Sequence, residues 1–488
     1  MKNYDALIFD LSVKGRKGYT LPASKVPSVN LPEKLLRAAK PELPEVNELG
    51  VLRHFTNMSF KNYGIETNMY PLGSCTMKYN PKIHQDIAAL PAFSSVHPYQ
   101  KEKDSQGLLK MIHGLQGFLS TISGMAEFTL NSFAGAHGEL VGLMVMKKYH
   151  EDQGNTEKVN VLVPDAAHGT NPASAILAGF NVVEISSNVD GTVNMEDFYA
   201  KLDEKTAGIM LTNPNTIGVF ERNILEISKA MHEAGGLLYY DGANLNPLLG
   251  IARPGDMGFD IMHINLHKTF STPHGGGGPG AGPVGVASHL AKYLPAPRVK
   301  KENDDYTLDW SLAGKLGQIS PFYGNFGVYV KAYAFILTYG KEHLASISKM
   351  AVLNANYVKE SLKDVYELPS KALCKHEFVF NGLKDKSTHV TTLDVAKRLL
   401  DYGFHPPTIY FPLLYKEALM IEPVETESKQ TIDVFIEVLR TIAKEAKENP
   451  DFVKASPHTT IVRRLDEALA ARRPVLTYDQ FKALESLA

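Results

Sequence analysis

Cysteine is nearly absent from this chain of 488 residues. The two cysteines, Cys75 and Cys374, lie far apart in the sequence and lack the spacing of metal ligands. We therefore expect neither a disulfide framework nor a zinc site, and no other metal-ligand pattern stands out. Two free thiols suit a protein of the reducing cytosol.

Excess charge and long apolar runs are missing as well. The formal net charge is −2, which gives no indication of a nucleic-acid or membrane-surface partner. No stretch approaches the roughly 20 apolar residues needed to cross a bilayer. The first residues, MKNYDALIFDLSVKGRKGY, mix acids with apolar residues and lack the apolar core of a signal peptide. We expect a cytoplasmic protein that binds neither nucleic acid nor membrane.

The composition that is present is that of a large soluble protein, 44% hydrophobic and 21% charged. The length suits two or three domains with a large buried core. Changes in pattern predict an irregular, Pro-rich N-terminal segment that wraps over another surface, then a large domain, a smaller α+β domain and a charged tail. These regions span residues 1–95, 96–330, 331–455 and 456–488.

Short apolar runs alternate with helix-length segments in the second region. They predict strands at Val159–Val163, Val182–Ile185, Gly208–Leu211, Leu237–Tyr240, Ile261–Leu266 and Val284–Ala287. This alternation is typical of βαβ units around a buried, mainly parallel sheet. Ligands of such sheets bind at the C-terminal ends of the strands, and polar segments follow four of these runs. The α+β region is predicted from helices at Tyr329–Tyr339 and Thr431–Lys447 and strands at Glu377–Phe380 and Ala418–Ile421.

Lys268 follows one of the apolar runs directly, in the segment Asn265–Thr269. A lysine after a buried strand is costly unless it is paired or used covalently. Carbonyl chemistry needs an unprotonated amine, which burial favours. The segment therefore predicts a Schiff-base lysine for pyridoxal 5'-phosphate (PLP), with a salt-bridged or surface lysine as the alternative.

Asp241 ends the run Leu237–Tyr240, 27 residues before Lys268. A carboxylate at a strand end can pair with a protonated pyridine nitrogen, which makes PLP an electron sink. Taken alone, an aspartate such as Asp241 is more often a helix cap, because Asp-Gly turns and caps are common. The order of an aspartate and then a lysine at the ends of successive strands favours the cofactor interpretation.

Three further segments suit the same cofactor. Ser132–Glu139 brings small residues to the start of an apolar helix, where backbone N–H groups can bind phosphate, unless it is a simple turn. His168 follows Val159–Val163 and is a candidate to stack on the cofactor ring, although most lone histidines are structural. Thr212 is a candidate to bond the cofactor's phenolic oxygen or a substrate group, in a segment that also resembles a turn of Asn and Pro.

The tract Gly275–Gly280 matches the dinucleotide pattern G-x-G-x-x-G only formally, because Pro279 interrupts it and no clear crossover helix follows. We expect instead a flexible loop that gives access to the ring of the cofactor.

Together these segments resemble the P-protein of the glycine cleavage system, glycine dehydrogenase (decarboxylating), and within that family the second subunit of the two-chain form. The likeness covers nearly the whole chain. It rests on Glu66–Lys78, Ala134–Glu139, Ala167–Ser174, Asp241–Asn246, Asn265–Gly280, Pro321–Gly327, His376–Phe378 and Tyr402–Pro412.

The resemblance implies an α/β protein of the PLP-dependent transferase fold type I, with a mainly parallel seven-stranded sheet and a smaller α+β C-terminal domain. It implies decarboxylation of glycine, release of CO2 and transfer of the aminomethyl group to the lipoyl group of H-protein. Lys268, Asp241 and His168 would be catalytic. The implied cofactor-binding residues are Ala134, Gly135, Ala136, His137, His168, Thr212, Asp241, Asn244, His267 and Lys268.

The resemblance also implies partners. They are glycine, the lipoylated H-protein and a companion first subunit, in a heterotetramer of two plus two chains. Asn68, Lys78 and His405 lie in matching loops as candidates for contact with substrate or lipoate.

Two other functions compete with this one. Another fold-type I PLP enzyme, such as a cysteine desulfurase or an aminotransferase, would share the aspartate and the lysine but not the loop around Cys75 or the Gly275–Gly278 tract. A non-catalytic binding subunit of a larger assembly would lack the absorbance of a lysine-bound cofactor.

Overall fold

The computed structural model describes residues 6–18, 22–275, 280–311, 314 and 316–486. The chain divides into two compact units, Met1–Thr67 and Asn68–Ala488. Residues 68–95 therefore belong to the same unit as the large sheet. The division into four regions at residues 95, 330 and 455 stays a prediction. No helix of the described residues is long and apolar enough to span a bilayer.

The first unit has little regular structure and almost no core. It contains a 3-10 turn, η1 (Glu33–Leu35), and one helix, α1 (Glu48–Ser59), whose start is capped by the side chain of Asn47. Val46 alone is buried among its described residues. Large apolar side chains stay exposed, among them Leu31, Leu35, Leu36, Leu43, Leu52, Phe55 and Phe60. Exposure on this scale is typical of a segment that packs against another surface.

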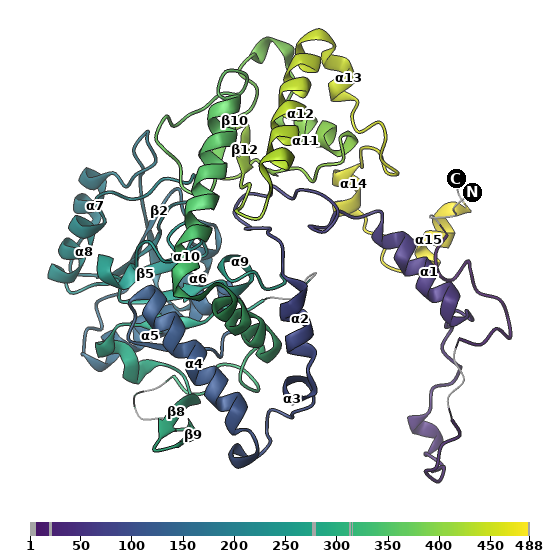
Figure 1. Cartoon of the computed structure of the whole chain (residues 1–488), viewed down its shortest axis with the longest axis horizontal. Helices are drawn as coiled ribbons and strands as arrows, with labels where there is room; N and C mark the ends of the chain where they lie inside the picture. The colour runs from purple at the N-terminus through teal and green to yellow at the C-terminus, as the bar shows by residue number, and fades with distance from the viewer. Residues whose placement is uncertain (1–5, 19–21, 276–279, 312–313, 315, 487–488) are drawn as a thin grey trace. The chain divides into compact units, whose positions relative to one another are not determined.

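The second unit is built on a seven-stranded sheet, in the order β1-β7-β6-β5-β4-β2-β3 (Figure 1). The strands are β1 (Glu127–Thr129), β2 (Asn160–Pro164), β3 (Asn181–Ile185), β4 (Thr206–Thr212), β5 (Leu237–Gly242), β6 (Ile261–Ile264) and β7 (Val284–Val286). Only β7 is antiparallel to its neighbours, β1 and β6, so the sheet is mainly parallel, as expected. All six residues of β5 are buried, which explains its unbroken apolar run.

Helices cover both faces of this sheet and bury two apolar cores. They are α4 (Gln106–Ser123), α5 (Gly135–Asp152), α6 (Thr170–Leu177), α7 (Met195–Lys201), α8 (Ile224–Glu233) and α9 (Leu266–Thr269). Around them lie α2 (Lys82–Ala89), α3 (Pro91–Ser94), a hairpin of β8 (Arg298–Glu302) and β9 (Asp305–Asp309), and the 3-10 turns η2 (Glu102–Asp104), η3 (Pro254–Met257) and η4 (Ser288–Tyr293).

The C-terminal elements form a smaller layer with its own core. The helix α10 (Phe326–Leu362) leads to it and is broken at Gly340, where φ is 60°. A three-stranded antiparallel sheet, ordered β10-β12-β11, contains β10 (Phe378–Asn381), β11 (Thr408–Ile409) and β12 (Ala418–Ile421). The remaining elements are η5 (Lys386–Thr388), α11 (Thr392–Asp401), α12 (Lys429–Glu448), α13 (Pro450–Lys454), α14 (Glu467–Arg472) and α15 (Tyr478–Glu485). Figure 1 shows β10, β12, α11 and α12 gathered together at one end of this unit.

Strand register places three polar side chains in one row across the large sheet. Thr212 of β4 pairs with Asp241 of β5, and Asp241 pairs with His263 of β6. Because the three strands are parallel, these residues lie at the same C-terminal edge. The predicted strand Ile261–Leu266 is two residues too long, since α9 already begins at Leu266. Lys268 thus lies in a one-turn helix at this edge.

Candidate active site

A cavity of about 350 Å³ opens at the C-terminal edge of the large sheet. Its walls come from the segment after β6, the ends of β4 and β5, the start of α5, the loop before α6 and the loop around Ser74. The lining residues are Ser74, Ala134, Gly135, Ala136, Glu139, His168, Thr170, Thr212, Thr216, Asp241, Ala243, Asn244, Asn265, His267, Lys268 and His274. Nine of the ten predicted site residues are among them.

Lys268 reaches this cavity from α9 and is half-buried. Its backbone N–H donates to the carbonyl of Asn265 at 3.0 Å, which starts the helical turn. The neighbouring His267 is a neutral ring, because burial, together with His274 and Lys268, lowers its pKa to about 3. Residues 276–279 of the glycine tract lie outside the described residues, so the loop expected there stays a prediction.

Asp241 is a buried carboxylate held by four neighbours. Asn171 donates to its Oδ2 at 2.9 Å and the backbone N–H of Ala243 donates to Oδ1 at 2.9 Å. His263 Nε2 lies 3.4 Å from Oδ1. Burial by itself raises the pKa of Asp241, but His263, these hydrogen bonds and Lys268 together hold it below the usual value. Asp241 is therefore ionised at neutral pH, and it ends a strand rather than capping a helix.

The start of α5 is a glycine-lined edge of the cavity. Ala134 has extended backbone and precedes the helix, so the first N–H groups of α5 have no partner within the helix. A Cβ on Gly135 would lie 2.5 Å from Asn265 Oδ1, which leaves no room for a side chain. The position suits an anion bound by backbone N–H groups. His137 does not line the cavity, since its Nδ1 accepts from the backbone N–H of Phe133 at 3.2 Å.

Two polar atoms at the cavity lack a hydrogen-bond partner among the described residues. They are Thr212 Oγ1 and Asn265 Oδ1, and both are buried. Buried polar atoms of native proteins nearly always have a partner, so a bound molecule is expected to supply one. Asn244, in contrast, donates to the carbonyl of Pro214 at 3.1 Å and to Glu377 Oε1 at 3.2 Å.

His168 also lines the cavity, with its Nδ1 2.8 Å from Thr170 Oγ1. Burial lowers its pKa, and Asp241 and Lys268 act on it in opposite directions. Its ring meets Phe411 edge-on, with the centroids 5.4 Å apart. A neutral imidazole that is held in place by these two contacts can stack on a flat ligand.

The segment Met69–Asn80, which we call the strap, joins the C-terminal layer to the lysine segment. Leu72 pairs with Ile421 of β12, and a Cβ on Gly73 would lie 2.2 Å from Met420 Cγ. Lys78 Nζ donates to the carbonyl of Thr269, to Asn246 Oδ1 and to Glu425 Oε1, at 2.9, 2.9 and 2.6 Å. Ser74 of the strap lines the cavity.

A buried acid cluster of His376, Glu377 and Glu422 lies behind the strap. Glu377 accepts from the backbone N–H of Ser74 at 2.7 Å, and Glu422 accepts from the N–H and the hydroxyl of Thr76 at 2.8 and 2.6 Å. Burial raises the pKa of Glu422 to about 7, and burial together with Glu422 raises that of Glu377. Burial lowers the pKa of His376 to about 3. The cluster therefore fixes the strap through hydrogen bonds, and its two carboxyl groups bind protons more readily than usual.

The other loop residues singled out in the sequence lie outside the cavity lining. Lys78 is buried in the strap, and His405 stacks on Tyr70 with the ring centroids 3.7 Å apart. Asn68 is exposed. Seven lining residues were not predicted as site residues, namely Ser74, Glu139, Thr170, Thr216, Ala243, Asn265 and His274. For Glu139, an acid in the apolar start of α5 was an available signal.

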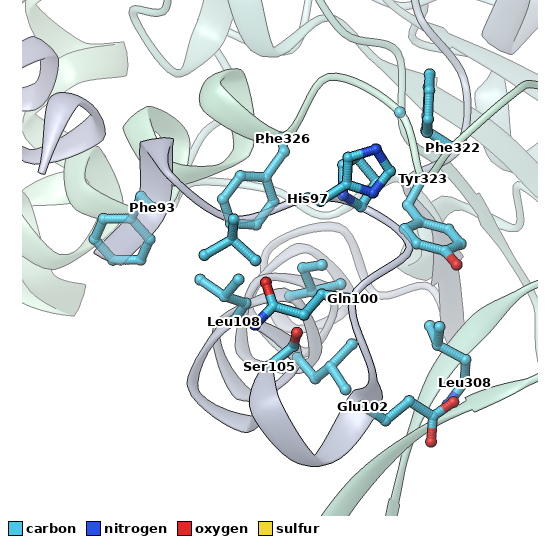
Figure 2. A pocket seen from close by; sticks show the side chains of 15 residues that line it. Phe93, His97, Gln100, Glu102, Ser105, Leu108, Leu308, Phe322, Tyr323 and Phe326 are labelled. Carbon is cyan, nitrogen blue, oxygen red and sulfur yellow. The ribbon is translucent and has the colours of Figure 1, made fainter. Parts of the chain in front are cut away.

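A second cavity, of about 100 Å³, lies elsewhere on the same unit. Figure 2 shows that its walls are mostly apolar and aromatic, with Phe93, Leu108, Leu308, Phe322 and Phe326 around it. It shares no residue with the lysine cavity and contains no lysine or aspartate. The chemistry therefore belongs to the cavity at the edge of the sheet.

Comparisons with known proteins agree with this geometry. The family model "Glycine cleavage system P-protein" matches residues 20–307, and the model "Glycine dehydrogenase, C-terminal domain" matches residues 347–462. The chain is 58% identical to the probable glycine dehydrogenase (decarboxylating) subunit 2 of Caldanaerobacter subterraneus, over 98% of this chain and 99% of the relative. It is 55% identical to the protein of the same name from Oceanobacillus iheyensis, over 98% and 99%.

Solved structures with low identity share the fold. A glycine decarboxylase (P-protein) of the glycine cleavage system superposes with a TM-score of 0.72 at 19% identity, over 84% of this chain and 93% of that one. A cysteine desulfurase from Escherichia coli superposes with a TM-score of 0.59 at 14% identity, over 78% and 95%. The fold is that of the PLP-dependent transferases of type I, as expected.

The cysteine of the strap provides a test of this arrangement. Burial raises the pKa of the Cys75 thiol to about 11, partly opposed by Lys268, and burial raises that of Cys374 to about 12. At pH 8 only about one Cys75 in a thousand would be a thiolate. In a Cys374→Ala variant we expect Cys75 to react with a disulfide reagent at least about tenfold more slowly when folded than when unfolded, because the loss of thiolate outweighs the higher nucleophilicity of the remaining thiolate. A thiol that reacts equally fast in both states would contradict this position of Cys75 in the strap.

Proposed function

The chain belongs to the P-protein family of the glycine cleavage system, and we propose that its lysine cavity decarboxylates glycine with PLP as cofactor. The enzyme releases CO2 and passes the remaining aminomethyl group to the lipoyl group of H-protein. The observation that carries the proposal is the meeting of Lys268, the ionised Asp241 and the open start of α5 in one cavity.

The residues of the cavity fit PLP at each of its functional groups. The aldehyde needs an amine, which Lys268 offers from the cavity wall. The pyridine nitrogen needs a carboxylate, and Asp241 is buried and ionised. The phosphate needs N–H donors without side chains in the way, which Ala134, Gly135 and Ala136 provide. Thr212 Oγ1 lacks a partner and suits the phenolic oxygen.

When bound, PLP supplies an electron sink for the pair of electrons released as the carboxylate leaves. Lys268 Nζ would anchor the cofactor covalently and would hold a proton once glycine has displaced it. Asp241 would keep the pyridine nitrogen protonated, because a buried carboxylate favours a positive neighbour. His168 would stack on the ring, and its Nδ1 stays with Thr170.

The remaining assigned residues would shape the pocket. Asn244 ties the end of β5 to the C-terminal layer through Glu377. His267, neutral and half-buried, packs beside His274, whose Nε2 meets the carbonyl of Cys75 at 3.0 Å. His137 would affect the phosphate site only indirectly, because its ring accepts a hydrogen bond from the backbone N–H of Phe133.

We also propose that this chain assembles with a companion chain, for two reasons. The relatives are named as a second subunit, so their enzyme contains a first one. The first unit of this chain exposes many large apolar side chains and buries only Val46 among its described residues. A heterotetramer of two plus two chains would cover that surface.

The first prediction of this proposal concerns the covalent anchor. Reduction of the PLP-loaded enzyme with borohydride should fix a pyridoxyl group on Lys268, because it is the lysine that lines the cavity. Peptide mapping would locate the label, and Lys268→Ala should remove both the label and the visible absorbance. A label on Lys78, the buried lysine of the strap, would contradict the assignment.

The second prediction concerns the electron sink. Asp241→Asn should fold and bind PLP but lose glycine–bicarbonate exchange by about a hundredfold or more, because an amide cannot hold the pyridine nitrogen protonated. Asp260→Asn is a matched control. Asp260 is also buried, but it bonds His232 at 2.8 Å and the backbone N–H of Leu238 and does not line the cavity. If Asp241→Asn and Asp260→Asn were equally active, Asp241 would not have this role.

The third prediction concerns assembly. The isolated chain should bind PLP weakly or exchange glycine poorly, and the companion subunit should restore the exchange. Deletion of residues 1–60 should abolish the complex, because it removes the exposed apolar segment. Exchange by the isolated chain at the rate of the co-expressed pair would contradict the need for a companion.

A further inference from the structure

Glu139 is a buried carboxyl group with three side-chain partners at the wall of the cavity. It lies in the first turns of α5 and is 4% exposed. Thr170 Oγ1 lies 2.9 Å from its Oε1, while Asn171 Nδ2 and Ser174 Oγ lie 3.1 Å from its Oε2. All three partners come from α6, so one carboxyl group organises the start of that helix.

Two of these bonds continue to the side chains proposed to meet the cofactor. Asn171 Nδ2 also donates to Asp241 Oδ2 at 2.9 Å. Thr170 Oγ1 also lies 2.8 Å from Nδ1 of His168. Glu139 is thus linked to Asp241 through Asn171 and to His168 through Thr170. The two branches differ, because the amide nitrogen of Asn171 can only donate, whereas the hydroxyl of Thr170 can donate or accept.

The hydroxyl of Thr170 has one proton, so it cannot donate to Glu139 and to His168 at the same time. When Glu139 is ionised, Thr170 donates to Glu139 and His168 Nδ1–H donates to Thr170. When Glu139 is protonated, it donates to Thr170, and Thr170 donates to an unprotonated Nδ1. In that second state the backbone N–H of Thr170, 3.2 Å away, donates to Nδ1 as well.

We propose that Glu139, Thr170 and His168 form a proton relay, in which Glu139 decides which nitrogen of His168 carries the proton. This role rests on the proposed function of the cavity. With Nδ1 turned to Thr170, Nε2 is the nitrogen that a bound molecule can meet. When Nε2–H gives its proton to that molecule, the Thr170 proton moves to Nδ1 and the Glu139 proton moves to Thr170. One proton leaves, Glu139 becomes a carboxylate, and the imidazole stays neutral throughout.

The surroundings favour this relay over a charged histidine. Burial, reinforced by Asp241, raises the pKa of Glu139 to about 7, against the hydrogen bonds from Thr170, Asn171 and Ser174. Burial lowers the pKa of His168, while Asp241 raises it and Lys268 lowers it, and the net direction is downward. Tyr239 of β5 is the other titratable group that interacts electrostatically with Glu139, and the next one along is His263, which pairs with Asp241. A proton near neutral pH therefore belongs on Glu139 and not on the ring of His168.

The relay is tested on the full chain without cofactor, by nitrogen-15 NMR of histidine-labelled protein. The signal of His168 is assigned from its loss in His168→Gln. We expect a neutral ring that changes from the Nε2–H to the Nδ1–H tautomer as the pH rises through about 7. Glu139→Gln and Thr170→Val should abolish the change, because they remove the titrating group and the hydroxyl. Thr170→Ser should keep it.

Ser174→Ala is the matched control. It removes one hydrogen bond to Glu139 without cutting the relay, so the change should persist with its midpoint raised, since that bond lowers the pKa of Glu139. One tautomer at every pH in the wild-type chain, or a change that persists in Thr170→Val, would overturn the proposal.

An activity measurement separates this inference from the proposed function. In the complex, Thr170→Val should slow glycine–bicarbonate exchange by roughly ten- to a hundredfold and remove the limb of its pH profile near 7, and Thr170→Ser should restore both. If no variant or wild-type complex exchanges glycine while the tautomer still changes, the proposed function fails and the relay stands. Unchanged exchange and an unchanged pH profile in Thr170→Val would overturn the role of the relay in the reaction.

Discussion

The candidate site depends on keeping one buried carboxylate ionised. Asp241 is 2% exposed, and burial on that scale favours the neutral acid. Asn171, the N–H of Ala243, His263 and Lys268 overcome that preference. Each of these groups is placed by a different element at the same edge of the sheet. The parallel register of β4, β5 and β6 is therefore the constraint from which the chemistry follows.

The C-terminal layer reaches this site through buried acids that hold the strap. Glu377 and Glu422 bind backbone N–H groups of Ser74 and Thr76, which adopt left-handed backbone with φ of 66° and 49°. Such conformations cost free energy in residues other than glycine and persist where the surroundings impose them. The strap is thus shaped by the C-terminal layer, and the cavity is complete only when that layer is in place.

Much of the site could be predicted because it follows from strand order. Asp241, Thr212 and Lys268 each come at or just after an apolar run, and parallel strands bring their C-terminal ends together. Strand β1 was not predicted, because its sequence Glu127-Phe128-Thr129 contains one apolar residue and so gives no apolar run. The predicted strand Ile261–Leu266 was too long, because a buried apolar residue such as Leu266 fits either a strand or a helix.

The partners of those residues could not be predicted in the same way. The contacts of the strap with Glu377 and Glu422 span 303 and 346 residues, and no local pattern encodes them. His137 belongs to the predicted phosphate segment, but helical rotation turns its ring toward Phe133 and away from the cavity. Glu139, two positions further on, is rotated into the wall. The direction of a side chain at a helix start depends on the boundary, which sequence patterns locate only approximately.

The most direct measurement is an experimental structure of the chain with its companion subunit and PLP. The account predicts continuous density between Lys268 Nζ and the cofactor, the phosphate at the N–H groups of Ala134–Ala136, and Asp241 at about 3 Å from the pyridine nitrogen. A cofactor bound elsewhere, or one in this cavity with its pyridine nitrogen away from Asp241, would contradict it.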